Sequence, residues 1–218
     1  MTYFGLLPPL LRGAFVTLEV TALAAVVGLV LAFAIGFMRL APNGLVRALA
    51  TVYVEVLRGT SALVQLFYLF FILPLLGITL DPMTTAVLGL GLNASAYGSE
   101  VVRTSIATVE RAQWEAALAL DMPAWLTMRR IVLPQAIPLM LPPFGNQLVD
   151  LLKSTSIVSL ITLTDLTFAG TQMITATGRK ELVWSLVLIL YFVMAYPMSL
   201  LARRLELRFG RFRGARQP

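Results

Sequence analysis

The chain has 218 residues, of which 58% are hydrophobic and only 13% charged, and it contains neither cysteine nor histidine. Soluble domains carry about 25% charged residues, so this composition excludes an ordinary water-soluble domain and indicates a membrane protein. Without cysteine and histidine, disulfides, thiol chemistry and the usual zinc ligands and general bases are excluded. The net charge of +6 is a marker of orientation in such a chain rather than evidence for nucleic-acid binding.

Five segments are apolar enough for helices that cross a bilayer, which requires roughly 20 residues each. We expect them at about 17–38, 62–78, 84–102, 144–166 and 182–201, within a single domain over residues 1–218. Pro74 is expected to kink the second span. The fourth is the least regular, because it contains Asp150, Lys153 and a run of hydroxyl residues. The first 15 residues lack the basic start and cleavage site of a removable signal peptide.

Most basic residues fall on alternate connections between these spans, whereas the opposite side carries only Arg12, Arg179 and Lys180. Those on the alternate connections are Arg39, Arg47 and Arg58 after the first span, Arg103, Arg111, Arg129 and Arg130 after the third, and Arg203, Arg204, Arg208, Arg211, Arg213 and Arg216 after the last. Cytoplasmic loops of membrane proteins are enriched in Lys and Arg. The pattern therefore predicts an all-α integral membrane protein with five transmembrane helices, the N-terminus outside and the C-terminus in the cytoplasm.

The connection over about 110–135 is unusual for a loop between spans. Its first part, "VERAQWEAALALD", is rich in strong helix formers. That helix must stop near Asp121, since Pro123 disfavours helical geometry at Met122, and Asp121 can either take the left-handed turn conformation or cap the next helix. We expect a helix–bend–helix elbow, followed by a path back into the membrane that the prolines from 134 to 143 break.

The expected apolar surface of the elbow is too large for a simple connector. It comprises Trp114, Ala117, Leu120, Trp125, Met128 and Val132. Two interpretations fit: a helix pair that lies on lipid, or a docking surface for a cytoplasmic partner.

The elbow resembles the EAA loop of the membrane subunits of ABC importers. Glu115, Ala116 and Ala117 match the start of that motif, and Ile131, Leu133 and Pro134 match its end. The stretches "YVEVLRGTSALVQLFYLFFILP", "NASAYGSEVVRTSI" and "PPFGNQLVDLLKSTSIVSLI" are similar to segments of the polar-amino-acid permease branch, and the similarity covers about residues 13–205.

Three positions depart from the family pattern. Asp121 stands where the family usually has glycine, Ser61 stands where it has proline, and "RTSI" at 103–106 replaces Arg-Gly-Gly-Ile. Aspartate is among the better non-glycine residues for a left-handed turn, so we expect the elbow to form with one extra charge on it.

The resemblance implies a type I ABC importer-like fold in the bacterial cytoplasmic (inner) membrane, with the elbow seated on a separate ATPase. The coupling residues it implies are Glu115, Ala116, Ala117, Leu120, Asp121, Met122 and Trp125. It also implies two ATP-binding subunits that hold ATP and Mg, a second membrane subunit that is identical or homologous, and an extracytoplasmic solute-binding protein. The chain has no Gly-x-x-x-x-Gly-Lys-Ser/Thr phosphate loop, so we expect no enzymatic activity and no cofactor of its own.

Polar side chains at membrane depth are costly and are candidates for a solute pathway. They are Gln65, Asn93, Ser95, Glu100, Asp150, Lys153, Ser154 and Thr155. Structural roles are the alternative for each: Glu100–Arg103 and Asp150–Lys153 have ion-pair spacing, and hydroxyl residues commonly serve helix packing, as do small residues such as Gly89, Gly91 and Gly98.

The predicted function is membrane translocation of a polar amino acid or amino-acid-like solute, driven by ATP hydrolysis on a partner. An ion-gradient-driven secondary transporter is the main alternative, although the inverted repeats common in such proteins are not found. A membrane enzyme is the third, and the sequence offers it no convincing nucleophile or metal constellation.

Overall fold

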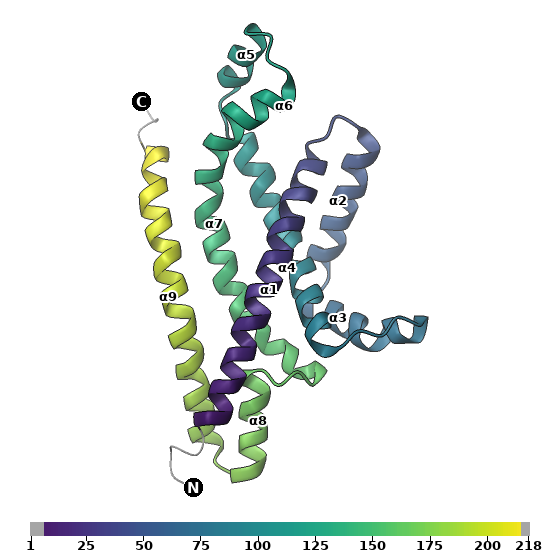
Figure 1. The fold of residues 1–218 in the computed structure, drawn as a ribbon, viewed down its shortest axis with the longest axis vertical. Coiled ribbons are helices and arrows are strands. Elements are labelled where there is room, and N and C mark those ends of the chain that lie inside the picture. Colours follow the sequence, from purple (N-terminus) through teal and green to yellow (C-terminus); the bar gives the residue numbers. More distant parts are fainter. Residues whose placement is uncertain (1–6, 215–218) are drawn as a thin grey trace.

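The structure is a computed structural model that describes residues 7–214, with side chains described for residues 7–208. The basic residues expected at positions 211, 213 and 216 therefore lie outside the described side chains. Within the described part of the chain, every regular element is helical (Figure 1).

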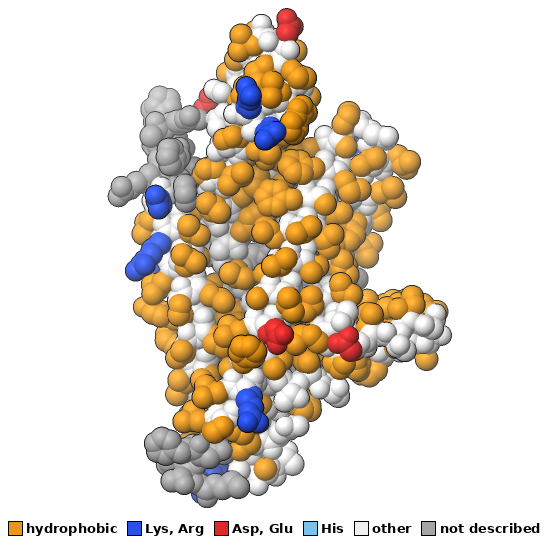
Figure 2. All heavy atoms as spheres, viewed as in Figure 1, with side chains coloured by type: hydrophobic (Ala, Val, Ile, Leu, Met, Phe, Trp, Pro, Cys, Tyr) orange, Lys and Arg blue, Asp and Glu red, His pale blue; other side chains and the backbone are white. Residues whose placement is uncertain are grey.

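Most of the molecule consists of helices that run along its long axis in alternating directions (Figure 1). They are α1 (Leu7–Arg39), α2 (Gly44–Gly59), α4 (Pro82–Ala107), α7 (Leu133–Ser154) and α9 (Lys180–Gly214). Hydrophobic side chains cover most of the visible face (Figure 2). By length and composition, α1 and residues 180–208 of α9 can each cross a membrane, and two bent helix pairs would raise that number from 2 to 4.

The structure differs from our expectation between the first and second expected spans. Residues 44–59, which we expected as a link, form α2, whose start is capped by the Asn43 side chain accepting a hydrogen bond from the Leu45 N–H at 2.9 Å. Residues 62–78 form three short helical pieces, α3 (Ala62–Phe67), the π-helical η2 (Tyr68–Ile72) and the 3₁₀-helical η3 (Leu73–Leu76). They turn by 102° from α2 and project sideways (Figure 1), because Thr60 and Ser61 are extended between the two helices.

The expected proline break after the elbow is wrong. α7 is continuous from Leu133 to Ser154, with Pro138, Pro142 and Pro143 inside it. Each proline removes one helical hydrogen bond, a loss that membrane helices tolerate when neighbouring groups satisfy the freed carbonyls. The expected span at 144–166 thus covers the second half of α7, the 3₁₀-helical η5 (Thr155–Ile161) and the link to α8 (Leu166–Thr177).

Glycines let α1 and α4 pack closely. A Cβ on Gly36 of α1 would lie 2.8 Å from the Val102 side chain, and one on Gly98 of α4 would lie 2.7 Å from Ala32 Cβ. Gly91 likewise faces Val27, whereas Gly89 faces Leu66 of α3. The packing role that we expected for these glycines is confirmed.

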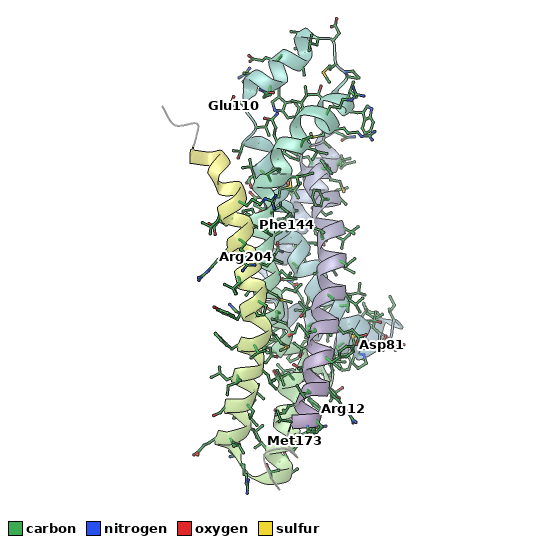
Figure 3. The ribbon with its side chains drawn as sticks, turned by 60° about the vertical axis from the view of Figure 1, so that its left-hand side comes forward. Arg12, Asp81, Glu110, Phe144, Met173 and Arg204 are labelled. Carbon is green, nitrogen blue, oxygen red and sulfur yellow. The ribbon has the colours of Figure 1, made fainter. Side chains whose placement is uncertain are left out.

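The elbow forms one end of the molecule and α8 the other (Figure 1). The elbow consists of α5 (Arg111–Ala119), α6 (Ala124–Thr127) and the π-helical η4 (Met128–Val132), which leads into α7. Figure 3 shows Glu110 and Arg204 toward the elbow end, and Arg12 and Met173 at the opposite end.

Candidate functional site: a polar groove and a projecting elbow

An open groove of about 630 Å³ lies between α2, α4 and α7. Its polar and aromatic lining comprises Arg58 of α2, Asn93, Tyr97, Glu100 and Thr104 of α4, and Asn146, Gln147, Asp150 and Ser154 of α7. Of the pathway residues predicted from the sequence, Asn93, Glu100, Asp150 and Ser154 therefore lie together. The groove is large enough for a small polar solute.

An ion-pair cluster forms at Glu100, in the half of the groove nearer the elbow. Glu100 is paired with Arg39 at the end of α1 and with Arg103 one turn further on α4, each at 2.5 Å. The pairing expected from the Glu100–Arg103 spacing is confirmed, and the partner on α1 could not be expected because it lies 61 residues away. The Glu100 carboxylate is satisfied on both sides, so its role in this structure is to join α1 to α4.

Two further charges face the groove from opposite walls. The Arg58 guanidinium of α2 lies over the Tyr97 ring, 5.4 Å from the ring centroid, at the range of a cation–π contact. Asp150 of α7 is 3.8 Å from Lys153, and both side chains are mostly exposed, so this pair contributes little stability. A guanidinium on one wall and a carboxylate on the other match the carboxylate and ammonium of a zwitterion.

Gln147 lies where α7 approaches α4. Its side-chain N–H donates to the Ala94 carbonyl of α4. Its Oε1 is buried and has no hydrogen-bond partner within the described residues. Because this atom is inaccessible to solvent, it lies within the contact between α4 and α7 rather than on the groove surface, and leaving it unpaired costs roughly 1–3 kcal/mol.

Gln65 and Ser95, two other predicted pathway residues, make structural contacts instead. The Gln65 amide donates to the Leu57 carbonyl and the Thr60 hydroxyl, both at 2.7 Å, and accepts from Asn93 at 3.2 Å. Ser95 is fully buried, 2.7 Å from the Tyr53 hydroxyl of α2. Both residues hold the end of α2 and the start of α3 against α4.

The remaining two predicted residues lie away from the groove. Thr155 is fully buried and donates to the Leu152 carbonyl at 2.7 Å. Lys153 lines a separate cavity on the α9 side of α7, together with Trp184 and Tyr191.

The sequence contained a signal for the groove residues that we missed. The groove residues on α4 include positions 93, 97, 100 and 104, and those on α7 include 143, 147, 150 and 154, with further residues such as Asn146 beside these two stripes. Both sets follow the i, i+4, i+7, i+11 spacing of a single helix face. Tyr97, Thr104 and Gln147 could have been found by extending each stripe, whereas Arg58 was read as a loop charge because α2 was not expected.

The turn of the elbow is a helix-ending Schellman motif. The N–H of Met122 donates to the Ala117 carbonyl and the N–H of Asp121 to the Leu118 carbonyl, each at 3.0 Å. Asp121 has φ of 51°, so it takes the left-handed conformation, one of the two alternatives expected. That conformation costs about 1–2 kcal/mol for most residues other than glycine, and Asp tolerates it better than most.

The apolar surface of the elbow differs in part from the expected one. Ala117 and Val132 are buried, and Trp114 and Met128 are half-buried against the base of the elbow. The exposed residues are Leu118 and Leu120, each 74% exposed, and Trp125, 64% exposed. The elbow therefore presents a hydrophobic tip.

Charged side chains surround this tip. The Arg129 guanidinium lies 5.1 Å from the centroid of the Trp125 ring, and Glu115 is paired with Arg111 at 3.1 Å on the exposed face of α5. Leu118, which the sequence analysis did not include, lies about 100° around α5 from the buried Ala117. An exposed apolar tip with a charged rim has the anatomy of a protein–protein contact.

Comparisons with known proteins agree on one family. Residues 24–211 match the family described as binding-protein-dependent transport system inner membrane component. A probable amino-acid ABC transporter permease protein y4tF of Sinorhizobium fredii is 43% identical over 223 residues, which cover 100% of this chain and 94% of that protein. The glutamine transport system permease protein GlnP of Escherichia coli K12 is 35% identical, with 93% of each chain covered.

Solved structures share the fold. A chain from the crystal structure of an amino acid ABC transporter with histidines superposes with a TM-score of 0.87 at 34% identity, covering 92% of this chain and 94% of that one. A chain of the inward-facing MetNI methionine ABC transporter superposes with a TM-score of 0.82 at 18% identity, covering 96% and 99%.

Proposed function

Since this chain belongs to the family of binding-protein-dependent transport system inner membrane components, we propose that it is the membrane-spanning subunit of an ATP-driven importer. Its solute is a polar amino acid or an amino-acid-like compound, delivered by an extracytoplasmic binding protein. The observation that carries the proposal is the joint presence of a zwitterion-matching groove along α4 and α7 and a projecting apolar elbow directly connected to both helices.

The groove supports the amino-acid assignment through its chemistry. Arg58 is the group for the solute carboxylate, since guanidinium–carboxylate hydrogen bonds are among the stronger ones in proteins. Asp150 is the group for the ammonium. The relatives named above for amino-acid and glutamine transport support the same class of solute.

The elbow is the element through which we propose that a separate ATPase drives transport. α4 enters it and α7 leaves it, so a displacement of the elbow acts directly on both walls of the groove. Two ATP-binding subunits and a second membrane subunit complete the proposed assembly. The chain crosses the bacterial cytoplasmic membrane five times, through α1, α2, α4, α7 and α9, with the elbow and the C-terminus in the cytoplasm.

The exposure of each elbow residue determines which substitutions can test docking without disturbing the fold. Ala117 is only 1% exposed, so a bulky residue there would disturb the elbow itself. Leu120→Asp changes an exposed side chain and tests docking alone. We expect it to leave membrane insertion intact and to abolish solute-stimulated ATP hydrolysis, with Leu207→Asp, an exposed leucine near the C-terminal end of α9 and outside the elbow, as the control.

Affinity purification of the tagged chain from mild detergent tests the proposed assembly. We expect a soluble ATP-binding subunit in a fixed ratio, with one or two membrane subunits. A lone chain that moves solute into liposomes without ATP, in response to an ion gradient, would instead establish the secondary-transporter alternative.

A further inference from the structure

Asp121 is an unfavourable residue for its own position in two independent respects. Its φ of 51° lies in the region that glycine occupies freely and other residues adopt with strain. It also follows the C-terminal end of α5, where the helix dipole places partial negative charge and a carboxylate is disfavoured. Glycine would avoid both penalties.

The backbone hydrogen bonds of the turn offset part of the strain, but no contact of the Asp121 side chain within the described residues offsets the charge penalty. The N-cap position of α6 is occupied by Pro123 and has no side-chain cap hydrogen bond. Asp121 is exposed, and no hydrogen bond or ion pair to its carboxylate occurs among residues 7–208. Strained residues retained at exposed positions commonly mark functional contacts.

The residues around Asp121 indicate what kind of partner could form a favourable contact with its carboxylate. Leu118 and Leu120, immediately before it, are each 74% exposed. Figure 1 shows the elbow projecting beyond the turn between α1 and α2, and Figure 2 shows both acidic and basic side chains at this end. A carboxylate beside exposed leucines fits a protein groove with an apolar floor and a cation at its edge, and it fits an anionic lipid surface poorly, because such a surface repels it.

We propose that Asp121 pairs with a lysine or arginine side chain of the ATP-binding subunit, and that this charge selects the subunit to which the elbow binds. The proposal rests on the proposed function, since it assigns the partner of the elbow to that ATPase. Leu118 and Leu120 supply the apolar contact, and Asp121 supplies electrostatic complementarity, which governs specificity more than total affinity.

The test measures the dissociation constant between the complete chain in lipid nanodiscs and the ATP-binding subunit that co-purifies with it. Asp121→Asn removes the charge and keeps a residue that tolerates the left-handed conformation. Asp121→Gly removes both the charge and the strain, and Asp121→Lys reverses the charge. Glu206→Gln on exposed α9 is the matched control for the loss of one negative charge toward the same end of the molecule.

We expect Asp121→Asn and Asp121→Gly to weaken binding roughly tenfold at low salt, and Asp121→Lys to weaken it further, as for close charge pairs at interfaces. The difference from wild type should shrink at high salt because ions screen the pair. Glu206→Gln should bind like wild type. Unchanged binding by Asp121→Asn and Asp121→Lys, or tighter binding by Asp121→Gly, overturns the proposal and leaves the importer assignment standing. Failure of any ATP-binding subunit to bind the wild-type chain overturns both.

Discussion

Arg58 lines the groove without a carboxylate partner among the described residues. The Arg58 guanidinium contacts the face of the Tyr97 ring. The Glu100 carboxylate, which also lines the groove, is instead paired with Arg39 and Arg103. A charge-assisted hydrogen bond to a solute carboxylate is worth about 1.5–3 kcal/mol. Loss of that bond in Arg58→Met should therefore raise the KM of uptake roughly tenfold to a hundredfold.

The measurement is ATP-dependent uptake into proteoliposomes that contain the purified assembly. Arg47→Met is the matched control, because Arg47 lies on the same helix, is exposed, and does not line the groove. Equal effects of the two substitutions would mean that Arg58 serves only the orientation of the helix and would remove it from the solute site.

At the scale of residues, the sequence predicted that polar side chains form the groove, but it did not predict correctly all of the residues that line it. Asn93, Glu100, Asp150 and Ser154 were predicted and line the groove. Gln65 could not be separated from them, because its partners are the carbonyl of Leu57 and the hydroxyl of Thr60. An amide that caps the end of one helix and an amide that faces a solute look the same in a hydropathy pattern.

At the scale of elements, the contact between α1 and α4 depends on the lack of a side chain at a few positions. A Cβ on Gly36 would lie 2.8 Å from two atoms of the Val102 side chain, closer than carbon atoms pack. Gly36→Ala should therefore destabilise the protein by roughly 1–3 kcal/mol, the range for overpacking a filled core. Thermal unfolding of the purified protein in detergent measures the difference.

Gly44→Ala provides the control for this substitution. Gly44 is the first residue of α2, and a Cβ there would meet nothing within 4 Å. Alanine favours helix over glycine by roughly 1 kcal/mol, so this variant should be neutral or slightly more stable. If Gly36→Ala were equally harmless, α1 and α4 would have to separate easily, and the rigid pairing of these two helices would be refuted.

The elements also show what local sequence could not predict. The span at 17–38 lies inside α1 and that at 182–201 inside α9, because both are long and uniformly apolar. α2 was missed because Arg47, Glu55 and Arg58 lower its hydropathy, although Leu45, Leu49, Val52 and Val56 form an exposed apolar stripe along it. The bend at Thr60 and Ser61 depends on contacts with α4, which no local pattern contains.

For the whole molecule, the order of the helices and the distribution of basic residues favour the same orientation of the chain in the membrane. The turn after α1 and the elbow lie toward the same end as the C-terminal part of α9, and α8 lies at the other end (Figure 1). Arg39, Arg103, Arg129, Arg130 and Arg203 all belong to segments at the elbow end. The positive-inside rule therefore supports the proposed orientation, in which that end faces the cytoplasm.

This orientation yields a prediction that the natural sequence makes easy to test, because the chain has no cysteine. Single cysteines at Ala41, Thr79, Ala119 and Thr175 lie in the turn after α1, the loop before α4, the elbow and α8. A membrane-impermeant maleimide should label Thr79→Cys and Thr175→Cys in intact spheroplasts, and Ala41→Cys and Ala119→Cys only in inverted vesicles. Strict alternation of the four sites requires one crossing by the bent segment of α2 and residues 62–76, one by α4 and one by α7, since these segments separate the neighbouring sites. Labelling of any two neighbouring sites from the same side would show that the segment between them does not cross the bilayer. In that case, the elbow could reach a cytoplasmic ATPase only if Ala119→Cys remained inaccessible from outside.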